Sequence, residues 1–146
     1  MGTDILHAGQ TGCGHVLKMI NNLILGGTGA ILSESLVLPV MAGVKPDPMY
    51  EALCAGSAGS FAVKNQIGQS VLKGVLEEGR FSVDYMMKDL GLALETGNVL
   101  HVPFPFGALP MQVYETARAA GKARKYYPVV ITQWEELTGV QARSEV

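Results

Sequence analysis

Residues 14–43 show helical periodicity throughout, and a single helix of this length is longer than a small helical domain is wide. At the usual rise of an α-helix it would form a rod of about 45 Å. Pro39 is expected to kink the last turns of this helix or to end it early, because proline lacks the amide hydrogen that the helix needs. The rod therefore needs cover on two sides, from its own domain and from a second subunit or another domain.

One face of this helix is polar and rich in small residues. In steps of four, four, three and four residues, the face holds Lys18, Asn22, Gly26, Gly29 and Ser33. A glycine inside a helix costs about 1 kcal/mol relative to alanine. We therefore expect the glycines at 26, 27 and 29 to make compensating close contacts with another backbone or with a ligand.

The opposite side of the same helix is apolar and is expected to be ordinary core. Its members are Val16, Ile20, Leu23, Ile24, Gly27 and Ile31. Glu34 lies near the middle of the apolar stretch 23–44, and this charge together with Pro39 disfavours membrane insertion by a few kcal/mol. We therefore predict a helix buried in protein and no membrane partner.

The rest of the sequence predicts shorter helices separated by glycine and proline, with no hairpin signal and no sustained strand alternation. Asp47 and Pro48 are expected to open one helix, and Ser82 is expected to cap another. The expected shorter helices cover residues 48–55, 63–78, 83–96, 109–120 and 128–137. The predicted fold class is therefore all-α, a helical bundle with one long N-terminal helix, in a single domain over residues 1–146.

Charge and motif content argue against several kinds of function. A net charge of −2 and a pI near 5.9 give no electrostatic footprint for nucleic acid. Four basic residues cluster late in the chain, at Arg118, Lys122, Arg124 and Lys125. They are interpreted as a solvated helix end, although a position near a cofactor stays open for one of them. No strand followed by Gly-x-Gly-x-x-Gly is present, so we expect a Rossmann domain to be absent from this chain.

The cysteines and histidines follow no metal or disulfide pattern. Cys13 and Cys54 lie far apart without Cys-x-x-Cys spacing, and no secretory segment precedes them, so a cytoplasmic location is predicted. His7, His15 and His101 lack His-x-x-x-His spacing and clustered carboxylates, so no metal site is predicted.

Two separated motifs carry the candidate chemistry. The first, Gly-x-Gly-x-x-x-Lys-x-x-Asn-Asn, places Lys18 and Asn22 one turn apart on one helix face. The second begins at Phe81 and ends in Lys88-Asp89-Leu90. Phe81 lies seven residues before Lys88, two turns on one helical face, and Asp84 lies four residues before the lysine. Taken alone, Lys18 is interpreted as a solvated charge at a helix start. Asp84 and Lys88, taken alone, are interpreted as an exposed ion pair worth a few tenths of a kcal/mol.

With these motifs in this order, the chain resembles the C-terminal domain of the β-hydroxyacid dehydrogenases, which include 3-hydroxyisobutyrate dehydrogenases and tartronate semialdehyde reductases. The resemblance covers residues 7–139, and residues 101–121 are similar to the sulfolactaldehyde and short aldehyde-acid reductase branch. It implies the all-α C-terminal domain of 6-phosphogluconate dehydrogenase-like enzymes, preceded in the family by a Rossmann domain. Pro39 and Tyr126-Tyr127 depart from the family pattern and weaken any assignment of substrate.

The resemblance implies reversible hydride transfer between NAD or NADP and the alcohol or aldehyde carbon of a small carboxylic acid. Lys18 would exchange the proton on the substrate oxygen as general acid and base, which is worth about a hundred- to ten-thousand-fold in rate. Asn22 would fix the substrate or the ammonium group. Lys88 resembles the lysine that approaches the nicotinamide cofactor. Asp89 resembles its hydrogen-bonding neighbour and a substrate contact, and Phe81 a wall of the substrate pocket.

Two hypotheses about function follow, one for an enzyme and one for a non-enzymatic module. In the first, the chain is the catalytic and dimerising half of a hydroxyacid dehydrogenase that assembles as a dimer or tetramer through its long helix. Lys18 and Lys88 are then expected to open onto one cleft that faces the missing domain, and this chain alone is expected to have little activity. In the second, the chain is a non-enzymatic helical dimerisation or interaction module, and both lysines are surface charges.

Overall fold

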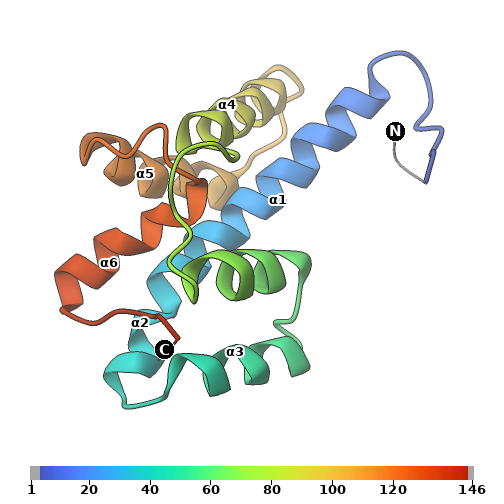
Figure 1. Cartoon of the computed structure of the whole chain (residues 1–146). Coiled ribbons are helices and arrows are strands. Elements are labelled where there is room, and N and C mark those ends of the chain that lie inside the picture. The colour runs from blue at the N-terminus through green and yellow to red at the C-terminus, as the bar shows by residue number, and fades with distance from the viewer. Residues whose placement is uncertain (1–3, 145–146) are drawn as a thin grey trace.

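The computed structural model describes residues 4–144, and its secondary structure is helical (Figure 1). In chain order the elements are α1 (Cys13–Ser35), α2 (Val37–Met41), α3 (Pro46–Ala55), the π-helix η1 (Val63–Val71), α4 (Val83–Val99), α5 (Pro105–Ala119), the 3₁₀ helix η2 (Tyr127–Val130) and α6 (Ile131–Thr138). Within residues 4–144 the β-type pairing is limited to one isolated bridge between Ser82 and Tyr126. The predicted all-α fold with one long N-terminal helix is confirmed.

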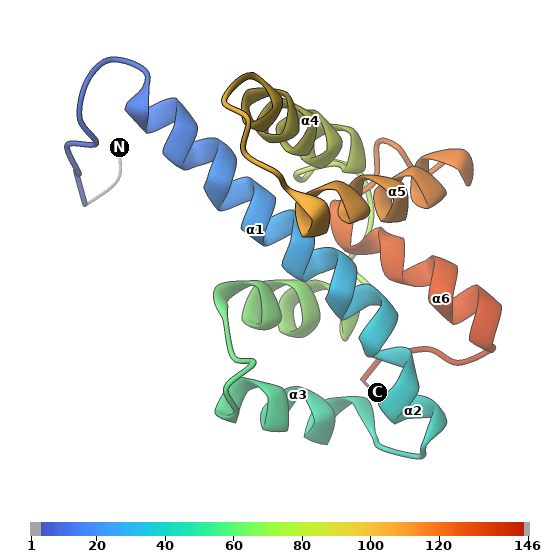
Figure 2. The same ribbon diagram turned by 180° about the vertical axis from the view of Figure 1, so that it is seen from behind.

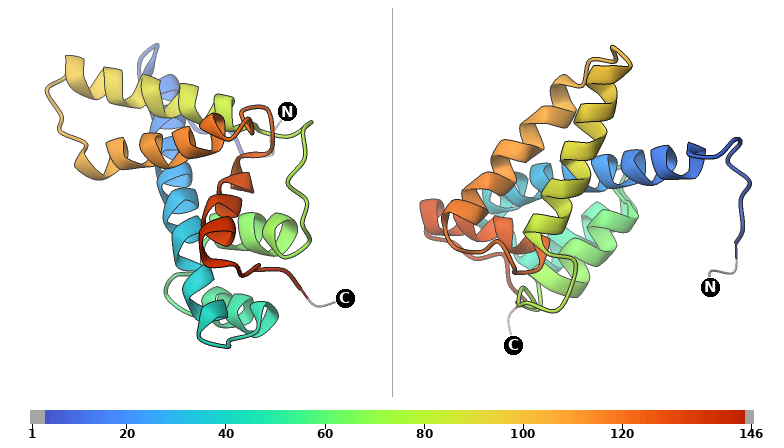
Figure 3. Two further views of the ribbon diagram at one scale, coloured as in Figure 1. Left: turned by 90° about the vertical axis from the view of Figure 1, so that its left-hand side faces the viewer. Right: turned by 90° about the horizontal axis from the view of Figure 1, so that it is seen from above.

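Helix α1 runs through the domain and contacts most of the other elements. Helices α4 and α5 lie side by side across it, and α6 packs against it nearer its C-terminal end (Figure 2). The pair formed by α3 and η1 lies on another side of α1, and the first turns of α1 project beyond the other helices (Figure 3). The largest fully buried side chains between these elements include Ile67, Met86, Leu90, Tyr114 and Ile131.

Pro39 determines where the long helix is interrupted. Because this residue has no amide hydrogen, the carbonyl group of Ser35 has no hydrogen-bond donor four residues later. Helix α1 ends at Ser35, and the short helix α2 follows after Leu36. The predicted early end is confirmed, whereas a single helix continuing to Gly43 was wrong.

The glycine-bearing face of α1 is buried, as the predicted close contacts require. A Cβ atom on Gly26 would lie 2.8 Å from Met86 Sδ of α4. A Cβ atom on Gly29 would lie 2.5 Å from the Tyr114 hydroxyl oxygen of α5, so both glycines let neighbouring helices approach closely. Gly27 differs, because its nearest neighbour would be Pro110 Cγ at 3.9 Å, an ordinary contact. The predicted close contact with another backbone or a ligand therefore stays a prediction for Gly27.

The expected core stripe on the opposite side of α1 is largely exposed. Val16, Ile24 and Ile31 are 42%, 65% and 57% exposed, whereas Leu23 is buried. The expectation that this stripe is ordinary core was therefore wrong. The small residues on the glycine-bearing face allow α4, α5 and η2 to pack against that face. The aliphatic side chains on the opposite face are therefore left exposed.

The span Cys13–Met41, which joins α1 and α2, is long and apolar enough to cross a membrane by length and composition. The mean hydropathy of its most apolar window is 1.6, and 44% of that window is buried inside the domain. The core helix of a domain passes the same test.

The helix expected over residues 63–78 is shorter than predicted and is wound as a π-helix that ends at Val71. The amide group of Leu72 donates to the carbonyl oxygen of Ile67, five residues back, at 2.9 Å. The ring of Tyr50 from α3 lies against η1, since a Cβ atom on Gly68 would come within 2.5 Å of it. The chain turns away at Gly74, where φ is +66°, so the prediction that Gly79 stops this helix was wrong.

The other short helices differ from prediction at their ends. Helix α3 ends at Ala55 as expected but begins at Pro46. Helix α4 begins at Val83 after the predicted cap, in which Ser82 Oγ accepts a hydrogen bond from the Tyr85 amide at 3.2 Å. Helix α5 begins earlier than predicted, and residues 128–137 are divided between η2 and α6.

Candidate functional site

Four polar side chains from α1 and α4 form one continuous chain of interactions. Lys18 Nζ donates a hydrogen bond to Asn22 Oδ1 at 3.1 Å. The amide nitrogen of Asn22 donates to Asp89 Oδ2, and Lys88 Nζ lies 2.7 Å from Asp89 Oδ1. The structure therefore brings together four of the five residues expected at the site. We call Lys18, Asn22, Asp89 and Lys88 the polar network.

The sequence around Gly26 explains why α1 and α4 meet at this network. Asn22 is 3% exposed and lies one turn before Gly26, the residue against which Met86 and Leu90 of α4 pack. A larger residue at this position would separate the two helices. Because Leu90 is adjacent in sequence to Asp89, close packing at Gly26 brings the carboxylate within reach of the Asn22 amide.

The hydrogen bonds of Asn22 fix the orientation of its amide group. An ionised carboxylate has only acceptor atoms, so Asp89 must face the NH₂ end of the amide. The carbonyl end is then turned toward Lys18, and it also accepts a hydrogen bond from Asn21 Nδ2 at 3.0 Å. Asp89 thus determines which atom of Asn22 holds the lysine.

Two positive groups flank one negative group in the polar network. The side chain of Asp89 is 15% exposed and that of Lys88 is 61% exposed, so the Lys88–Asp89 pair contributes less than about 1 kcal/mol to stability. Lys18 is also exposed, and an ammonium group has three N–H donors, of which the bond to Asn22 uses one. Lys18 can therefore donate further hydrogen bonds to an oxygen of a bound molecule. The expected cleft shared by the two lysines stays a prediction.

Phe81 lies apart from the polar network. Helix α4 begins at Val83, so Phe81 precedes the helix, and the argument that it shares a helical face with Lys88 was wrong. Its ring packs at 6.0 Å from the ring of Tyr85 and edge to face at 6.1 Å from that of Tyr127. Phe81 is therefore part of an aromatic cluster at the N-terminal end of α4.

The ion pair expected between Asp84 and Lys88 does not form. Asp84 Oδ1 lies 3.1 Å from Arg118 Nε of α5, and Lys88 pairs with its neighbour Asp89 instead. The spacing of four residues on a helix was correct, but α5 packs alongside α4 and supplies a better partner. The residues alone therefore pointed to the wrong carboxylate, and only the resemblance pointed to Asp89.

The late basic cluster is held in ion pairs by neighbouring acidic residues. Besides the Arg118 pair with Asp84, Lys122 Nζ lies 2.7 Å from Glu136, Arg124 Nη2 lies 3.3 Å from Glu78 and Lys125 Nζ lies 3.0 Å from Glu77. The cluster is partly solvated, as predicted from its place after a helix, and these charges compensate one another locally.

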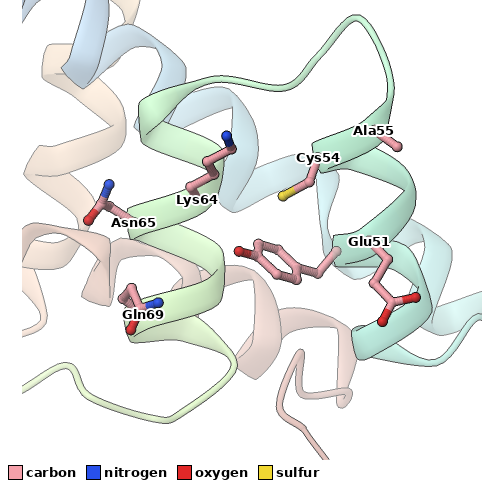
Figure 4. A pocket seen from close by; sticks show the side chains of 7 residues that line it. Glu51, Cys54, Ala55, Lys64, Asn65 and Gln69 are labelled. Carbon is pink, nitrogen blue, oxygen red and sulfur yellow. The ribbon is translucent and has the colours of Figure 1, made fainter.

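An open hollow lies between α3 and η1, on a different part of the domain from the polar network (Figure 4). Its lining residues are Tyr50, Glu51, Cys54, Ala55, Lys64, Asn65 and Gln69. A hydrogen bond with Cys54 raises the pKa of the Tyr50 hydroxyl. None of the five expected site residues lines this hollow. Among residues 4–144, no three His, Cys, Asp or Glu side chains gather as a metal-binding group.

The sequence family described as NAD-binding of NADP-dependent 3-hydroxyisobutyrate dehydrogenase matches residues 12–131. This match covers most of the chain and includes every residue of the polar network. The chain therefore belongs to this family of nicotinamide-dependent hydroxyacid dehydrogenases. The resemblance inferred from the two motifs is confirmed, and so is the association of the family with NAD or NADP.

Characterised relatives match nearly the whole chain. The 2-(hydroxymethyl)glutarate dehydrogenase of Eubacterium barkeri is 42% identical over 140 residues, which are 96% of this chain and 46% of the relative. The 3-sulfolactaldehyde reductase of Escherichia coli is 34% identical over 143 residues, which are 98% of this chain and 48% of the relative. The chain thus spans about half the length of the curated relatives it matches.

Solved structures share the helical fold. A 3-hydroxyisobutyrate dehydrogenase from Mycobacterium tuberculosis, solved with L-serine, superposes with a TM-score of 0.80 at 25% identity, covering 90% of this chain and 46% of that one. The corresponding enzyme from Salmonella typhimurium gives a TM-score of 0.77 at 29% identity, covering 84% and 42%. The predicted likeness to the helical domain of these enzymes is therefore confirmed.

Proposed function

We propose that this chain is the helical half of an NAD- or NADP-dependent oxidoreductase that interconverts a small β-hydroxyacid and its aldehyde acid. The observation that carries the proposal is the polar network, which joins an exposed lysine to a buried amide and a partly buried carboxylate in a chain of this family. The names of the relatives, a 2-(hydroxymethyl)glutarate dehydrogenase and a 3-sulfolactaldehyde reductase, support a small acid as substrate.

In this proposal Lys18 is the general acid and base. During oxidation the neutral amine of Lys18 takes the proton of the alcohol's hydroxyl group while the hydride leaves the carbon that bears this group. During reduction the ammonium group of Lys18 returns the proton to the carbonyl oxygen. The nicotinamide, when bound, accepts or supplies the hydride. A lysine in water is mostly protonated at neutral pH, so an apolar enclosure formed with a second domain would favour the neutral form.

Asn22 and Asp89 have supporting roles in this scheme. Asn22 Oδ1 would hold the ammonium group of Lys18, and the hydrogen bond of 3.1 Å between these two atoms supports this role. Both oxygens of Asp89 are engaged, one by Asn22 and one by Lys88, which favours a positioning role over the direct substrate contact first expected. The direct contact stays a prediction.

Lys88 and Phe81 are the proposed contacts with the cofactor and the substrate, respectively. The ammonium group of Lys88 is exposed beside the network, where it can approach a cofactor held by another domain. Phe81 contributes an apolar ring at the start of α4, and we keep it as the proposed wall of the substrate pocket. Cys13 and Cys54 are free thiols, which fits the proposed cytoplasmic location.

A second candidate function, association with another copy of the chain, is favoured by the exposed aliphatic residues of α1. The two functions are compatible, because Lys18 and Asn22 lie on a different side of the helix from those residues. We therefore propose that the enzyme assembles as a homo-oligomer through α1.

The test of the enzymatic role joins this chain to the first half of the 2-(hydroxymethyl)glutarate dehydrogenase of Eubacterium barkeri. We expect this chimera to oxidise NADH or NADPH with short aldehyde acids such as 3-sulfolactaldehyde. Lys18→Ala is expected to lower kcat at least a hundredfold. The matched control is Lys73→Ala, because Lys73 also donates to an amide oxygen four residues away, that of Gln69 at 2.8 Å.

Two results would count against the enzymatic role. One is a Lys18→Ala chimera whose kcat stays within threefold of the unmodified chimera. The other is a chimera that binds NADH with normal affinity but reduces none of the short aldehyde acids.

A further inference from the structure

Arg118 joins α5 to α4 through three contacts of its guanidinium group. The Nε atom lies 3.1 Å from Asp84 Oδ1, in the first turn of α4. The Nη1 atom lies 3.1 Å from Glu115 Oε2, three residues earlier on α5, and 3.9 Å from the sulfur atom of Met87 on α4. Because α4 and α5 lie side by side (Figure 2), the guanidinium group is held between the two helices.

The two contacts of Arg118 on α4 lie on the side of that helix away from Lys88. Successive side chains around an α-helix are separated by about 100°. Met87 is therefore about 60° from Asp84 in one direction around the helix, whereas Lys88 is about 40° from Asp84 in the other direction. Since Arg118 contacts both Asp84 and Met87, it draws the Asp84 carboxylate toward α5 and away from Lys88.

Two carboxylates compete for the ammonium group of Lys88. Asp84 lies four residues earlier, and an acidic residue four positions before a lysine is the favourable order for an ion pair on a helix. Asp89 follows Lys88 directly and lies about 100° further around the helix, on the side where it accepts a hydrogen bond from Asn22. Lys88 Nζ lies 2.7 Å from Asp89 Oδ1. Lys88 thus pairs with the carboxylate that Arg118 does not engage.

We propose that Arg118 is a positioning residue for Lys88. By pairing with Asp84 it removes the competing carboxylate, and Lys88 then stays with Asp89 in the polar network. This inference rests on the proposed function for the role of Lys88, whose ammonium group approaches the cofactor from this position. Arg118 contacts no member of the polar network and acts on Lys88 only through Asp84.

Loss of Arg118 leaves the Asp84 carboxylate available to Lys88. The Lys88 side chain is 61% exposed, so it can turn from Asp89 to Asp84 without disturbing the core. Its ammonium group is then held nearer the N-terminal end of α4 and farther from the polar network. Both pairs are of the weak, solvent-exposed kind, so the expected change in cofactor binding is about two- to fivefold.

The functional test uses the chimera with the first half of the Eubacterium barkeri enzyme. Arg118→Gln is expected to raise the KM for NADH or NADPH about two- to fivefold and to leave kcat within about twofold, because Lys18 and Asn22 are unchanged. Arg124→Gln is the matched control. It removes the same charge from a side chain that is 81% exposed and paired with Glu78, so KM should stay unchanged. An unchanged KM in the Arg118→Gln chimera would overturn the proposal.

Asp84→Asn separates the capture of this carboxylate from a general effect of charge. If Arg118 acts by holding Asp84, then Asp84→Asn alone leaves KM unchanged, and the same substitution in the Arg118→Gln chimera restores the natural KM. If Arg118 only attracts the anionic cofactor, Asp84→Asn alone lowers KM by about the factor by which Arg118→Gln raises it. This second result, or a raised KM that Asp84→Asn does not restore, would overturn the proposal.

NMR of the chain by itself tests the pairing of Lys88 without a cofactor. In the natural chain we expect nuclear Overhauser effects between the ε-methylene protons of Lys88 and the β protons of Asp89. In Arg118→Gln these effects should weaken, and effects to the β protons of Asp84 should appear, while the circular dichroism spectrum stays unchanged. Arg124→Gln should keep the natural pattern.

Failure of this inference can be told apart from failure of the proposed function. An inactive chimera would overturn the enzymatic role, whereas the NMR comparison would still decide whether Arg118 keeps Asp84 away from Lys88. Conversely, a Lys88 side chain that stays with Asp89 in the Arg118→Gln chain would overturn the positioning role, even in a fully active chimera.

Discussion

Asn22 and Asp89 lie 67 positions apart in the chain, and the buried amide of the first donates a hydrogen bond to the carboxylate of the second. This bond joins the two motifs that were recognised separately in the sequence. It also connects a structural role with a chemical one, because the same amide that ties α1 to α4 holds the ammonium group of Lys18. A change at Asp89 should therefore affect both stability and catalysis.

Asp89→Ala is expected to lower the free energy of unfolding by about 1–3 kcal/mol, because it leaves the buried NH₂ group of Asn22 without its partner. Urea unfolding at pH 7 measures the loss. Asp84→Ala is the control, since its carboxylate is 49% exposed in the pair with Arg118, and it should cost less than about 1 kcal/mol. Equal losses for the two variants would contradict a buried bond between Asn22 and Asp89.

Gly26→Ala is expected to destabilise the domain by about 1–3 kcal/mol, because the added methyl group would meet Met86 Sδ at 2.8 Å and Leu90 Cδ2 at 3.0 Å. Gly91→Ala on α4 is the matched control, since no atom lies within 4 Å of a Cβ atom built there. It should stabilise the helix by up to about 1 kcal/mol. Thermal unfolding of both variants, followed by circular dichroism, measures the two changes in stability. Changes in the same direction for Gly26→Ala and Gly91→Ala would contradict the close packing at Gly26.

The sequence predicted the helical architecture well because its signals are local. The start of α4 follows from the serine cap at Ser82, and the end of α1 follows from Pro39, each of which acts through the nearest backbone groups. The π-helical winding of η1 is different. It accompanies the packing of the Tyr50 ring on Gly68, a contact between two elements that no periodicity within one of them reveals.

The apolar stripe of α1 was expected to be core, and most of it is exposed for a physical reason. Hydrophobicity favours burying Ile24 and Ile31, but two glycines and a serine on the other face allow closer helix packing, and the polar atoms there find partners. Ser33 Oγ and Gln66 Nε2 both donate to the carbonyl oxygen of Gly29, at 2.8 and 3.1 Å. Gln66 comes from η1, a distant element, so the hydropathy pattern of α1 alone could not reveal this partner.

The candidate site was predictable to the extent that it depends on spacing within a helix. The step of four residues from Lys18 to Asn22 was correct, and their hydrogen bond follows from it. The choice between Asp84 and Asp89 depended on how α5 packs beside α4, which is a tertiary property. The step of seven residues from Phe81 to Lys88 does not lie on one helical face, because α4 begins only at Val83, after the Ser82 cap.

Arg143→Met is expected to destabilise the domain by about 2 kcal/mol, because it leaves the buried carboxylate of Glu135 without a counter-charge. Arg143 donates to both oxygens of Glu135, at 2.6 and 2.9 Å, and the carboxylate also accepts from the Ala142 amide at 3.0 Å. These bonds fasten the C-terminal segment onto α6. Arg124→Met is the control, since Arg124 is 81% exposed in its pair with Glu78, and it should change stability by less than about 0.5 kcal/mol. Arg143→Met should unfold at a lower denaturant concentration than Arg124→Met. Limited proteolysis should also cleave its C-terminal segment faster.

The stability of the domain is expected to fall above about pH 10, and Tyr114 contributes to this fall. Burial raises the pKa of the Tyr114 hydroxyl well above its ordinary range, with a further contribution from Tyr127. The folded chain therefore keeps this proton after the unfolded chain has lost it. The stabilisation is fully present below the unfolded pKa near 10 and is lost as the pH rises beyond it, by up to about 1.4 kcal/mol per pH unit.

Tyr114→Phe should remove this contribution and make the decline of stability above pH 10 less steep. It should also cost about 1 kcal/mol at neutral pH, since the hydroxyl group donates to the Gly26 carbonyl oxygen at 3.1 Å. Urea unfolding at pH 7, 9, 10.5 and 11 measures both effects. The difference between the two proteins should be constant from pH 7 to 9 and then shrink. A difference that stays constant up to pH 11 would show that Tyr114 does not cause the alkaline loss of stability.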